Sequence, residues 1–118
     1  SMVNKEIPAK MMQLQLKDKG ILYSSYISFF ENGGLFVQTE DNFSLSDDVL
    51  LVLELANLDN KLFIRTKVGW INPARTSANR PKGIGLAFGA DDISLQAKHL
   101  IEIELAGIIK NERPTYTL

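Results

Sequence analysis

Alternation of apolar and polar positions dominates the chain and predicts a β-rich fold. Between residues 11 and 88, short apolar segments are separated by turn-forming residues, which is the pattern of half-buried strands. Six segments follow it. They span residues 11–16, 21–28, 35–39, 49–55, 62–71 and 83–88. The sequence therefore predicts six short strands. In the strand over residues 62–71, the alternation places Val68 and Trp70 on the same face.

After residue 91 the apolar period changes to that of an α-helix. Apolar residues between 95 and 109 form one broad stripe, and Asp91, Asp92 and Ser94 supply capping groups before it. The predicted helix ends near Asn111, because Pro114 is poorly tolerated in a helix interior. We therefore expect an all-β fold with one C-terminal helix, arranged as a six-stranded antiparallel β-barrel that the helix closes at one end.

The chain has 118 residues, which is typical of one domain. Residues 1–10 show no period and contain Pro8, so we expect a flexible N-terminal lead-in, in which Ser1 is interpreted as a tag remnant. The barrel and its helix are expected to occupy residues 11–111. Residues 112–118 are expected to form a C-terminal tail.

The composition argues against several classes of partner. The formal net charge is −1, which favours neither nucleic acid nor an acidic membrane. The absence of cysteine excludes disulfides and thiolate metal sites. No apolar run approaches the length that crosses a bilayer, so we expect a cytoplasmic protein with no membrane insertion and no nucleic-acid partner.

The sequence offers no convincing catalytic, cofactor or metal site. His99 is the only histidine, and it lies within the predicted helix. The adjacent acidic pairs 47–48 and 91–92 each precede a structured element and are better interpreted as caps or turns. Gly83 and Gly85 lack the third glycine and the following helix of a dinucleotide loop. We expect a protein that is not an enzyme.

Aromatic residues near turns and chain ends are the best candidates for a functional surface. Gly33 and Gly34 form a predicted turn, and Phe29 and Phe30 lie immediately before it. Such rings are poorly placed for complete burial, and exposed aromatics mark partner surfaces. The candidate contact residues are Tyr23, Phe29, Phe30, Trp70, Pro73 and Tyr116.

Three segments together resemble the PilZ domain family, in particular its small single-domain type IV pilus assembly members. They are residues 16–26, the turn Gly33-Gly34-Leu35-Phe36-Val37, and residues 68–73 joined by a loop to Gly83-Ile84-Gly85-Leu86-Ala87-Phe88. The tail from Lys110 also fits. The resemblance covers nearly the whole chain and implies a PilZ-type β-barrel.

Ligand-binding members of this family hold cyclic di-GMP with an Arg-x-x-x-Arg motif and an Asp/Asn-x-Ser-x-x-Gly motif. On this chain the glycine of the second motif falls on Gly34, its serine on Glu31 and its Asp/Asn on Phe29. No arginine precedes Arg65, so the first motif is absent. The resemblance therefore implies the fold without the cyclic di-GMP site and without a cofactor.

The resemblance further implies a non-enzymatic adaptor in type IV pilus biogenesis and twitching motility. Its expected partners are the pilus extension ATPase of the PilB type and a FimX-type EAL-domain protein that responds to cyclic di-GMP. The alternative is a direct cyclic di-GMP receptor that uses Arg75, Arg80 and Lys82, because guanidinium and ammonium groups suit phosphate.

Overall fold

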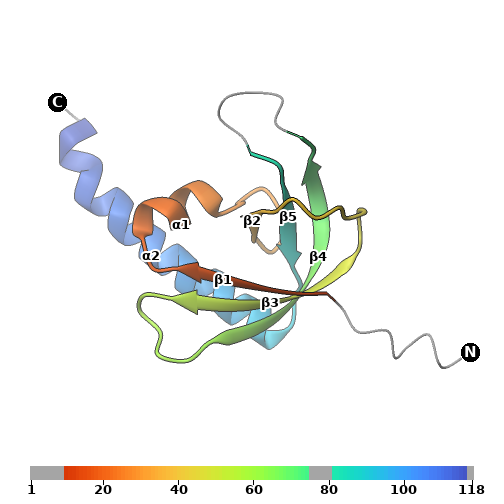
Figure 1. The fold of residues 1–118 in the computed structure, drawn as a ribbon. Helices are drawn as coiled ribbons and strands as arrows, with labels where there is room; N and C mark the ends of the chain where they lie inside the picture. Colours follow the sequence, from red (N-terminus) through yellow and green to blue (C-terminus); the bar gives the residue numbers. More distant parts are fainter. Residues whose placement is uncertain (1–9, 75–80, 117–118) are drawn as a thin grey trace, which may run out of the picture.

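The computed structural model describes the backbone of residues 10–74 and 81–116, with side chains up to residue 107. The described part contains five strands and two helices (Figure 1). In chain order they are β1 (Lys10–Leu16), α1 (Lys19–Ser25), β2 (Gly34–Gln38), β3 (Asp48–Leu55), β4 (Leu62–Asn72), β5 (Gly83–Phe88) and α2 (Asp92–Tyr116).

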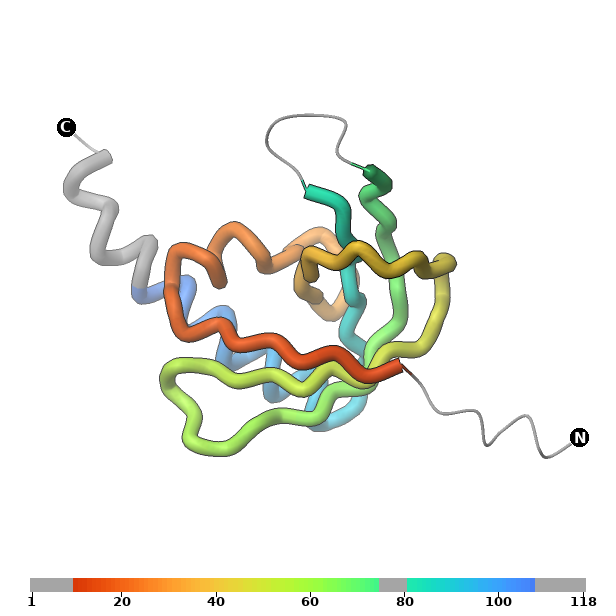
Figure 2. Tube along the Cα trace, in the orientation of Figure 1, coloured from red at the N-terminus to blue at the C-terminus, as the bar shows by residue number. Residues whose placement is uncertain are grey.

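The strands form one curled sheet in the order β1-β3-β4-β5-β2. β1 runs parallel to β3, and the remaining pairs are antiparallel. The trace in Figure 2 shows that the sheet bends into a half-barrel, with β1 and β2 as its two edges. A mostly β fold with a C-terminal helix is confirmed. The expected six-stranded antiparallel barrel is wrong, because one predicted strand is a helix and the sheet is mixed.

The missing strand is the segment 21–28, most of which belongs to α1. Asp18 caps this helix by accepting a hydrogen bond from the Ile21 backbone at 3.0 Å. Leu22 is the only residue of α1 that is buried, whereas Ile21 and Tyr23 are exposed. A half-buried strand would bury every second residue instead, and the cap overrides the β-forming composition. What remains of the predicted strand is a single antiparallel bridge between Tyr26 and Leu35.

The predicted alternation in β4 is confirmed along most of the strand. Leu62, Ile64, Thr66 and Val68 are buried, and the residues between them are exposed. The Thr66 hydroxyl donates a hydrogen bond of 2.7 Å to the Val49 carbonyl, which satisfies this polar group inside the core.

The helix α2 begins where the capping pattern predicted. The Ser94 hydroxyl donates to Asp91 Oδ1 at 2.7 Å, and the Leu95 backbone donates to the Asp91 carbonyl at 3.0 Å. This contact to Ser94 lowers the pKa of Asp91. The helix continues to Tyr116, so the expected end near Asn111 is too early. Pro114 removes one N–H donor but does not by itself stop a helix, since prolines inside helices also produce kinks.

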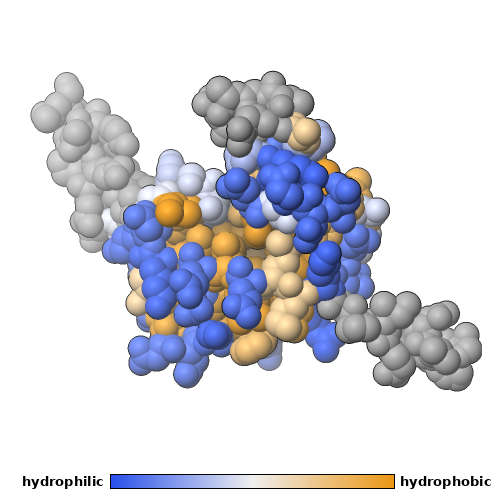
Figure 3. Space-filling model, viewed as in Figure 1, coloured by the Kyte–Doolittle hydropathy of each residue, from blue (hydrophilic) through white to orange (hydrophobic). Residues whose placement is uncertain are grey.

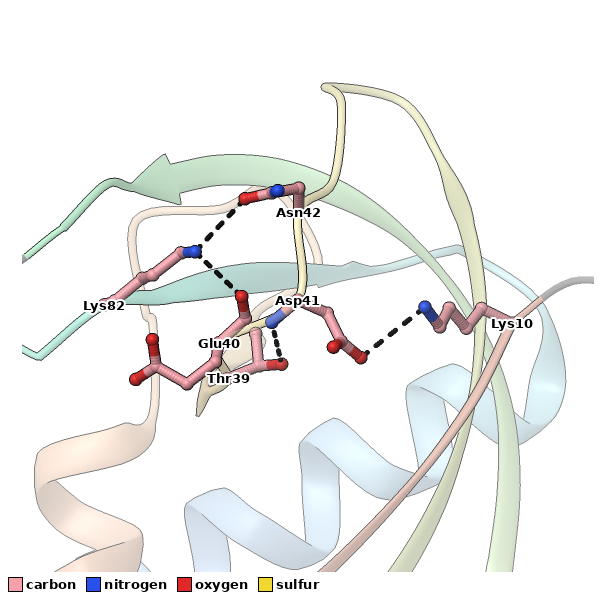
Figure 4. Close-up of polar contacts among 6 residues, drawn as sticks. All are labelled: Lys10, Thr39, Glu40, Asp41, Asn42 and Lys82. Carbon is pink, nitrogen blue, oxygen red and sulfur yellow. Dashed lines mark hydrogen bonds and ion pairs between the residues drawn. The ribbon is translucent and has the colours of Figure 1, made fainter.

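Two lysines hold the loop between β2 and β3 (Figure 4). Lys82, immediately before β5, donates to the Glu40 carbonyl at 2.8 Å and to Asn42 Oδ1 at 3.1 Å. At the other end, Lys10 on β1 lies 3.5 Å from Asp41 Oδ2. The loop therefore connects two strands that do not pair with each other.

Ile101 anchors α2 in the core, since its side chain is 0% exposed. We expect Ile101→Ala to lower the free energy of unfolding by about 2–5 kcal/mol, because it leaves a cavity. Ile103→Ala, at a position 49% exposed on the same helix, serves as the control and should change stability by less than about 1 kcal/mol. Urea denaturation of both variants measures the difference. Equal losses would mean that α2 does not pack as described.

Candidate functional site

A β-bulge in β4 brings Trp70 to the outer face of the sheet. Val68 pairs with Leu86 on β5, but Trp70 pairs with Gly85, so Gly69 is the extra residue. The sequence pattern placed Trp70 on the same face as the buried Val68. Because the bulge shifts the alternation by one residue, Trp70 instead shares a face with Gly85. That expected orientation of Trp70 is therefore wrong.

Phe36 joins Trp70 across the sheet. Phe36 on β2 pairs with Gly85, and Gly85 pairs with Trp70, so the three residues form one row. The rings of Phe36 and Trp70 lie 5.5 Å apart between centroids, at an interplanar angle of 47°. Because Gly85 has no side chain, the two rings meet above the central strand of this row.

Phe30 packs on glycine backbone in the same area. A Cβ atom added at Gly34 would lie 2.7 Å from the Phe30 ring, and one at Gly69 would lie 3.1 Å from it. A Cβ at Gly85 would lie 3.3 Å from the same ring. Three glycines from three strands thus form the surface on which Phe30 rests.

Phe29 covers this arrangement and faces solvent. Its ring centroid lies 5.2 Å from that of Phe30 and 6.4 Å from that of Trp70, both with edge-to-face geometry. Phe29 is 75% exposed. We call Phe29, Phe30, Phe36 and Trp70 the aromatic cluster.

Backbone hydrogen bonds fix the turn that carries Phe29 and Phe30. Gly33 has φ = 73°, a value that favours glycine, and its N–H donates to the Phe30 carbonyl at 3.0 Å. The Gly33 carbonyl accepts from Phe88 at 3.0 Å, and the Gly34 carbonyl accepts from Ile27 at 2.8 Å. The turn is therefore held to β5, so the position of the cluster is set by the sheet.

Tyr26 connects this turn to α2. Its hydroxyl donates a hydrogen bond of 2.7 Å to Glu102 Oε2, and Lys98 lies 3.5 Å from the same oxygen. Partial burial, followed by the contact with Glu102, raises the pKa of the Tyr26 hydroxyl well above its ordinary value. Tyr26 therefore remains a neutral hydrogen-bond donor at physiological pH.

The structure brings together three of the six candidate residues, namely Phe29, Phe30 and Trp70. Pro73 follows β4 and is exposed. Tyr23 is 60% exposed on α1, and no ring contact joins it to the cluster in the described part of the chain. The side chain of Tyr116 lies outside the described residues.

Sequence reasoning missed Phe36 as a member of the cluster. The alternation in β2 already placed Phe36 opposite the buried Leu35 and Val37. Its contact with Trp70 depends on the bulge at Gly69 and on the pairing of β2 with β5, neither of which is visible in the local sequence.

Lys82 is engaged within the chain, through its bonds to Glu40 and Asn42 in the loop of Figure 4. Arg75 and Arg80, the other residues of the alternative cyclic di-GMP site, lie outside the described residues. Glu31, at the position of the motif serine, is exposed beside Phe29.

Within residues 10–74 and 81–107, no group of three or more metal-ligating side chains comes together. Asp47 accepts a hydrogen bond from the Ser44 backbone at 2.8 Å, which agrees with its interpretation as a turn residue. None of the helices searched has the length and apolar character needed to cross a membrane.

The described fold is a curled β half-barrel closed by a C-terminal helix, with an aromatic cluster at its glycine turn. The family model of the PilZ domain matches residues 8–106, and the chain belongs to the PilZ domain family. No curated protein matches the chain. Domains of this family are in general non-enzymatic and serve as cyclic di-GMP-related receptors or adaptors.

The glycines beneath the cluster yield a test of its packing. Gly85→Ala places a Cβ 2.9 Å from Ile27 and 3.1 Å from Trp70, and we expect it to lower the free energy of unfolding by about 1–3 kcal/mol. The matched control is Gly107→Ala in α2, where a Cβ meets nothing within 4 Å, and it should be neutral or stabilising by about 0.5–1 kcal/mol.

Trp70 is the only tryptophan, so its fluorescence reports on the cluster. We expect Gly85→Ala to shift the emission maximum and Gly107→Ala to leave it unchanged. An unchanged spectrum together with wild-type stability in Gly85→Ala would contradict the packing described for the cluster.

Proposed function

We propose that this PilZ-domain protein is a non-enzymatic adaptor in type IV pilus biogenesis and twitching motility. It links a pilus extension ATPase of the PilB type to a FimX-type EAL-domain protein through protein contacts. The EAL-domain protein responds to cyclic di-GMP, so the cyclic di-GMP signal reaches this chain indirectly, through contact with that protein.

The observation that carries this proposal is the exposed ring of Phe29 above Trp70. Phe29 stands at the position of the Asp or Asn that reads the nucleotide in ligand-binding relatives, and Glu31 stands at the position of the serine. An apolar ring cannot hydrogen-bond a guanine, and a carboxylate adds negative charge near a dianionic ligand. The same ring is a suitable anchor for a protein surface, because aromatic side chains bury a large area at small entropic cost.

Pro73 and Tyr23 extend the proposed contact surface. Pro73 lies just beyond β4, the strand that carries Trp70, and it is exposed. Tyr23 lies on α1 and is separate from the cluster, so it belongs either to the margin of one interface or to a second interface. Tyr116 remains a candidate contact in the proposal.

Substitution at the cluster tests the adaptor role. We expect Trp70→Ala to weaken co-precipitation with the ATPase or the EAL-domain protein by at least about tenfold, as for a central aromatic of an interface. Tyr23→Ala should weaken at least one of these contacts. Phe63→Ala is the control, because Phe63 lies on β4 like Trp70, is 59% exposed, close to the 60% of Tyr23, and makes no ring contact with the cluster.

Far-UV circular dichroism of each variant separates lost binding from lost folding. The variant Trp70→Phe keeps an aromatic ring at this position and so separates loss of the ring from loss of the indole. Binding of both partners that is unchanged in Trp70→Ala and Tyr23→Ala would overturn the assignment of these contacts.

Titration calorimetry with cyclic di-GMP distinguishes the adaptor from a direct receptor. We expect no heat of binding with the purified protein, because the two polar motif positions carry Phe29 and Glu31. Affinity in the micromolar range or tighter would instead favour the alternative site of Arg75, Arg80 and Lys82. In that case Lys82→Ala should abolish the heat, whereas Lys61→Ala should not.

A further inference from the structure

The strand β1 has one edge that pairs with β3 and one free edge. Its register with β3 runs from Lys10 opposite Val49 to Leu16 opposite Leu55. β1 is an edge strand of the sheet. In the described part of the chain, the backbone groups of β1 make no hydrogen bond to a turn or loop. Every second residue of a strand directs its N–H and C=O groups toward the free edge, so β1 offers a row of donors and acceptors.

This edge lacks the features that usually prevent pairing with another strand. Residues 11–16 have the sequence Met-Met-Gln-Leu-Gln-Leu, without a charge, a proline or a glycine. Edge strands that stay unpaired are commonly blocked by a central lysine, a proline or a bulge. Here the charges stand only outside the segment, at Lys10 and Lys17.

The surface along β1 is also apolar. Met12 and Leu14 are only half-buried although they belong to the face that packs on the core. Met11, on the opposite face, is 57% exposed. Figure 3 shows orange, apolar atoms uncovered over β1 and β3 between the blue polar ones. A strand added to this edge would cover the half-buried side chains of β1.

The charges at the two ends decide what kind of strand fits. An antiparallel pair of two copies that uses the whole of β1 brings Lys10 of one copy near Lys17 of the other, at both ends, and like charges opposite each other are destabilising. Within the chain, Lys10 lies 3.5 Å from Asp41 and Lys17 lies 3.9 Å from Glu54. Both lysines are more than half exposed, and Lys10 also lies 5.2 Å from the centroid of the Phe43 ring. Such exposed pairs are weak, so the lysines are able to exchange these partners for carboxylates of a bound segment.

We propose that the free edge of β1 binds an extended segment of another protein by strand addition, and that this segment alternates apolar and polar residues between acidic ends. Backbone hydrogen bonds to β1 hold the segment, and its carboxylates meet Lys10 and Lys17. The surface uses no residue of the aromatic cluster, which lies over β2, β4 and β5. The inference therefore does not rest on the adaptor proposal.

Two synthetic peptides test the inference with the full, ¹⁵N-labelled chain. They share an alternating Val-Thr core, and one has Glu at both ends whereas the other has Lys. We expect the Glu-ended peptide to shift the amide signals of residues 10–16 and to slow hydrogen exchange at alternate residues of β1. The Lys-ended peptide should bind about fivefold more weakly, because two favourable end pairs become unfavourable.

A charge-reversed variant makes the test specific. In the double variant Lys10→Glu, Lys17→Glu the preference should reverse, with the Lys-ended peptide binding about fivefold more tightly. Lys61→Glu, in the turn between β3 and β4, is the control for a change in net charge and should keep the original preference.

Three results would overturn the proposal. The first is shift changes with neither peptide, or shift changes outside β1 only. The second is a dimer in sedimentation whose β1 amides are protected without peptide, which would assign the edge to a second copy. The third is a set of nuclear Overhauser contacts between residues 1–9 and β1, which would assign it to the chain's own N-terminal segment.

Discussion

The organisation of this domain depends on one contact, in which the Phe30 ring packs directly on the backbone of three glycines. Gly34, Gly69 and Gly85 come from three strands, and each would bring a Cβ into close contact with Phe30. Because Phe30 belongs to the turn after α1, this contact holds that segment against the sheet. The bulge at Gly69 and the row through Gly85 then set the positions of Trp70 and Phe36. A side chain at any of these glycines would press against the Phe30 ring, most closely at Gly34, where the added Cβ would lie 2.7 Å from it.

Local pattern was sufficient to predict much of the fold. Alternation located β3, β4 and β5, and Asp91 with Ser94 predicted the start of α2. Prediction from the local pattern failed where a single residue changed the structure that the hydrophobic period indicates. The Asp18 cap makes α1 from a segment rich in β-formers, and the bulge after Val68 turns Trp70 to the other face. Both depend on contacts that the local period does not contain.

The candidate site was predictable in part for the same reason. Phe29, Phe30 and Trp70 were noticeable because each stands at a turn or strand end, where burial is incomplete. That they share one surface follows only from the pairing of β5 with both β2 and β4. This pairing brings the turn before β2 next to β4, so that Phe29 lies 6.4 Å from Trp70 between ring centroids. Phe36 stayed unnoticed because a phenylalanine inside a strand is usually core, and here it stands on the outer face.

The curled sheet has two edges, and the chain treats them differently. At β2, the Tyr26–Leu35 bridge and the Ile27-to-Gly34 hydrogen bond cover the start of the strand, and Tyr26 ties this cover to Glu102 on α2. At β1, the end near Lys10 meets the loop after β2, through Asp41 and the Phe43 ring. A closed barrel would need a strand between these edges, and α1 occupies the place in sequence where that strand was expected. Replacing one strand by a helix therefore has two consequences. Within the described residues it leaves one edge of β1 without a paired strand, and it lets the following turn carry Phe29 and Phe30 onto the outer face of the sheet.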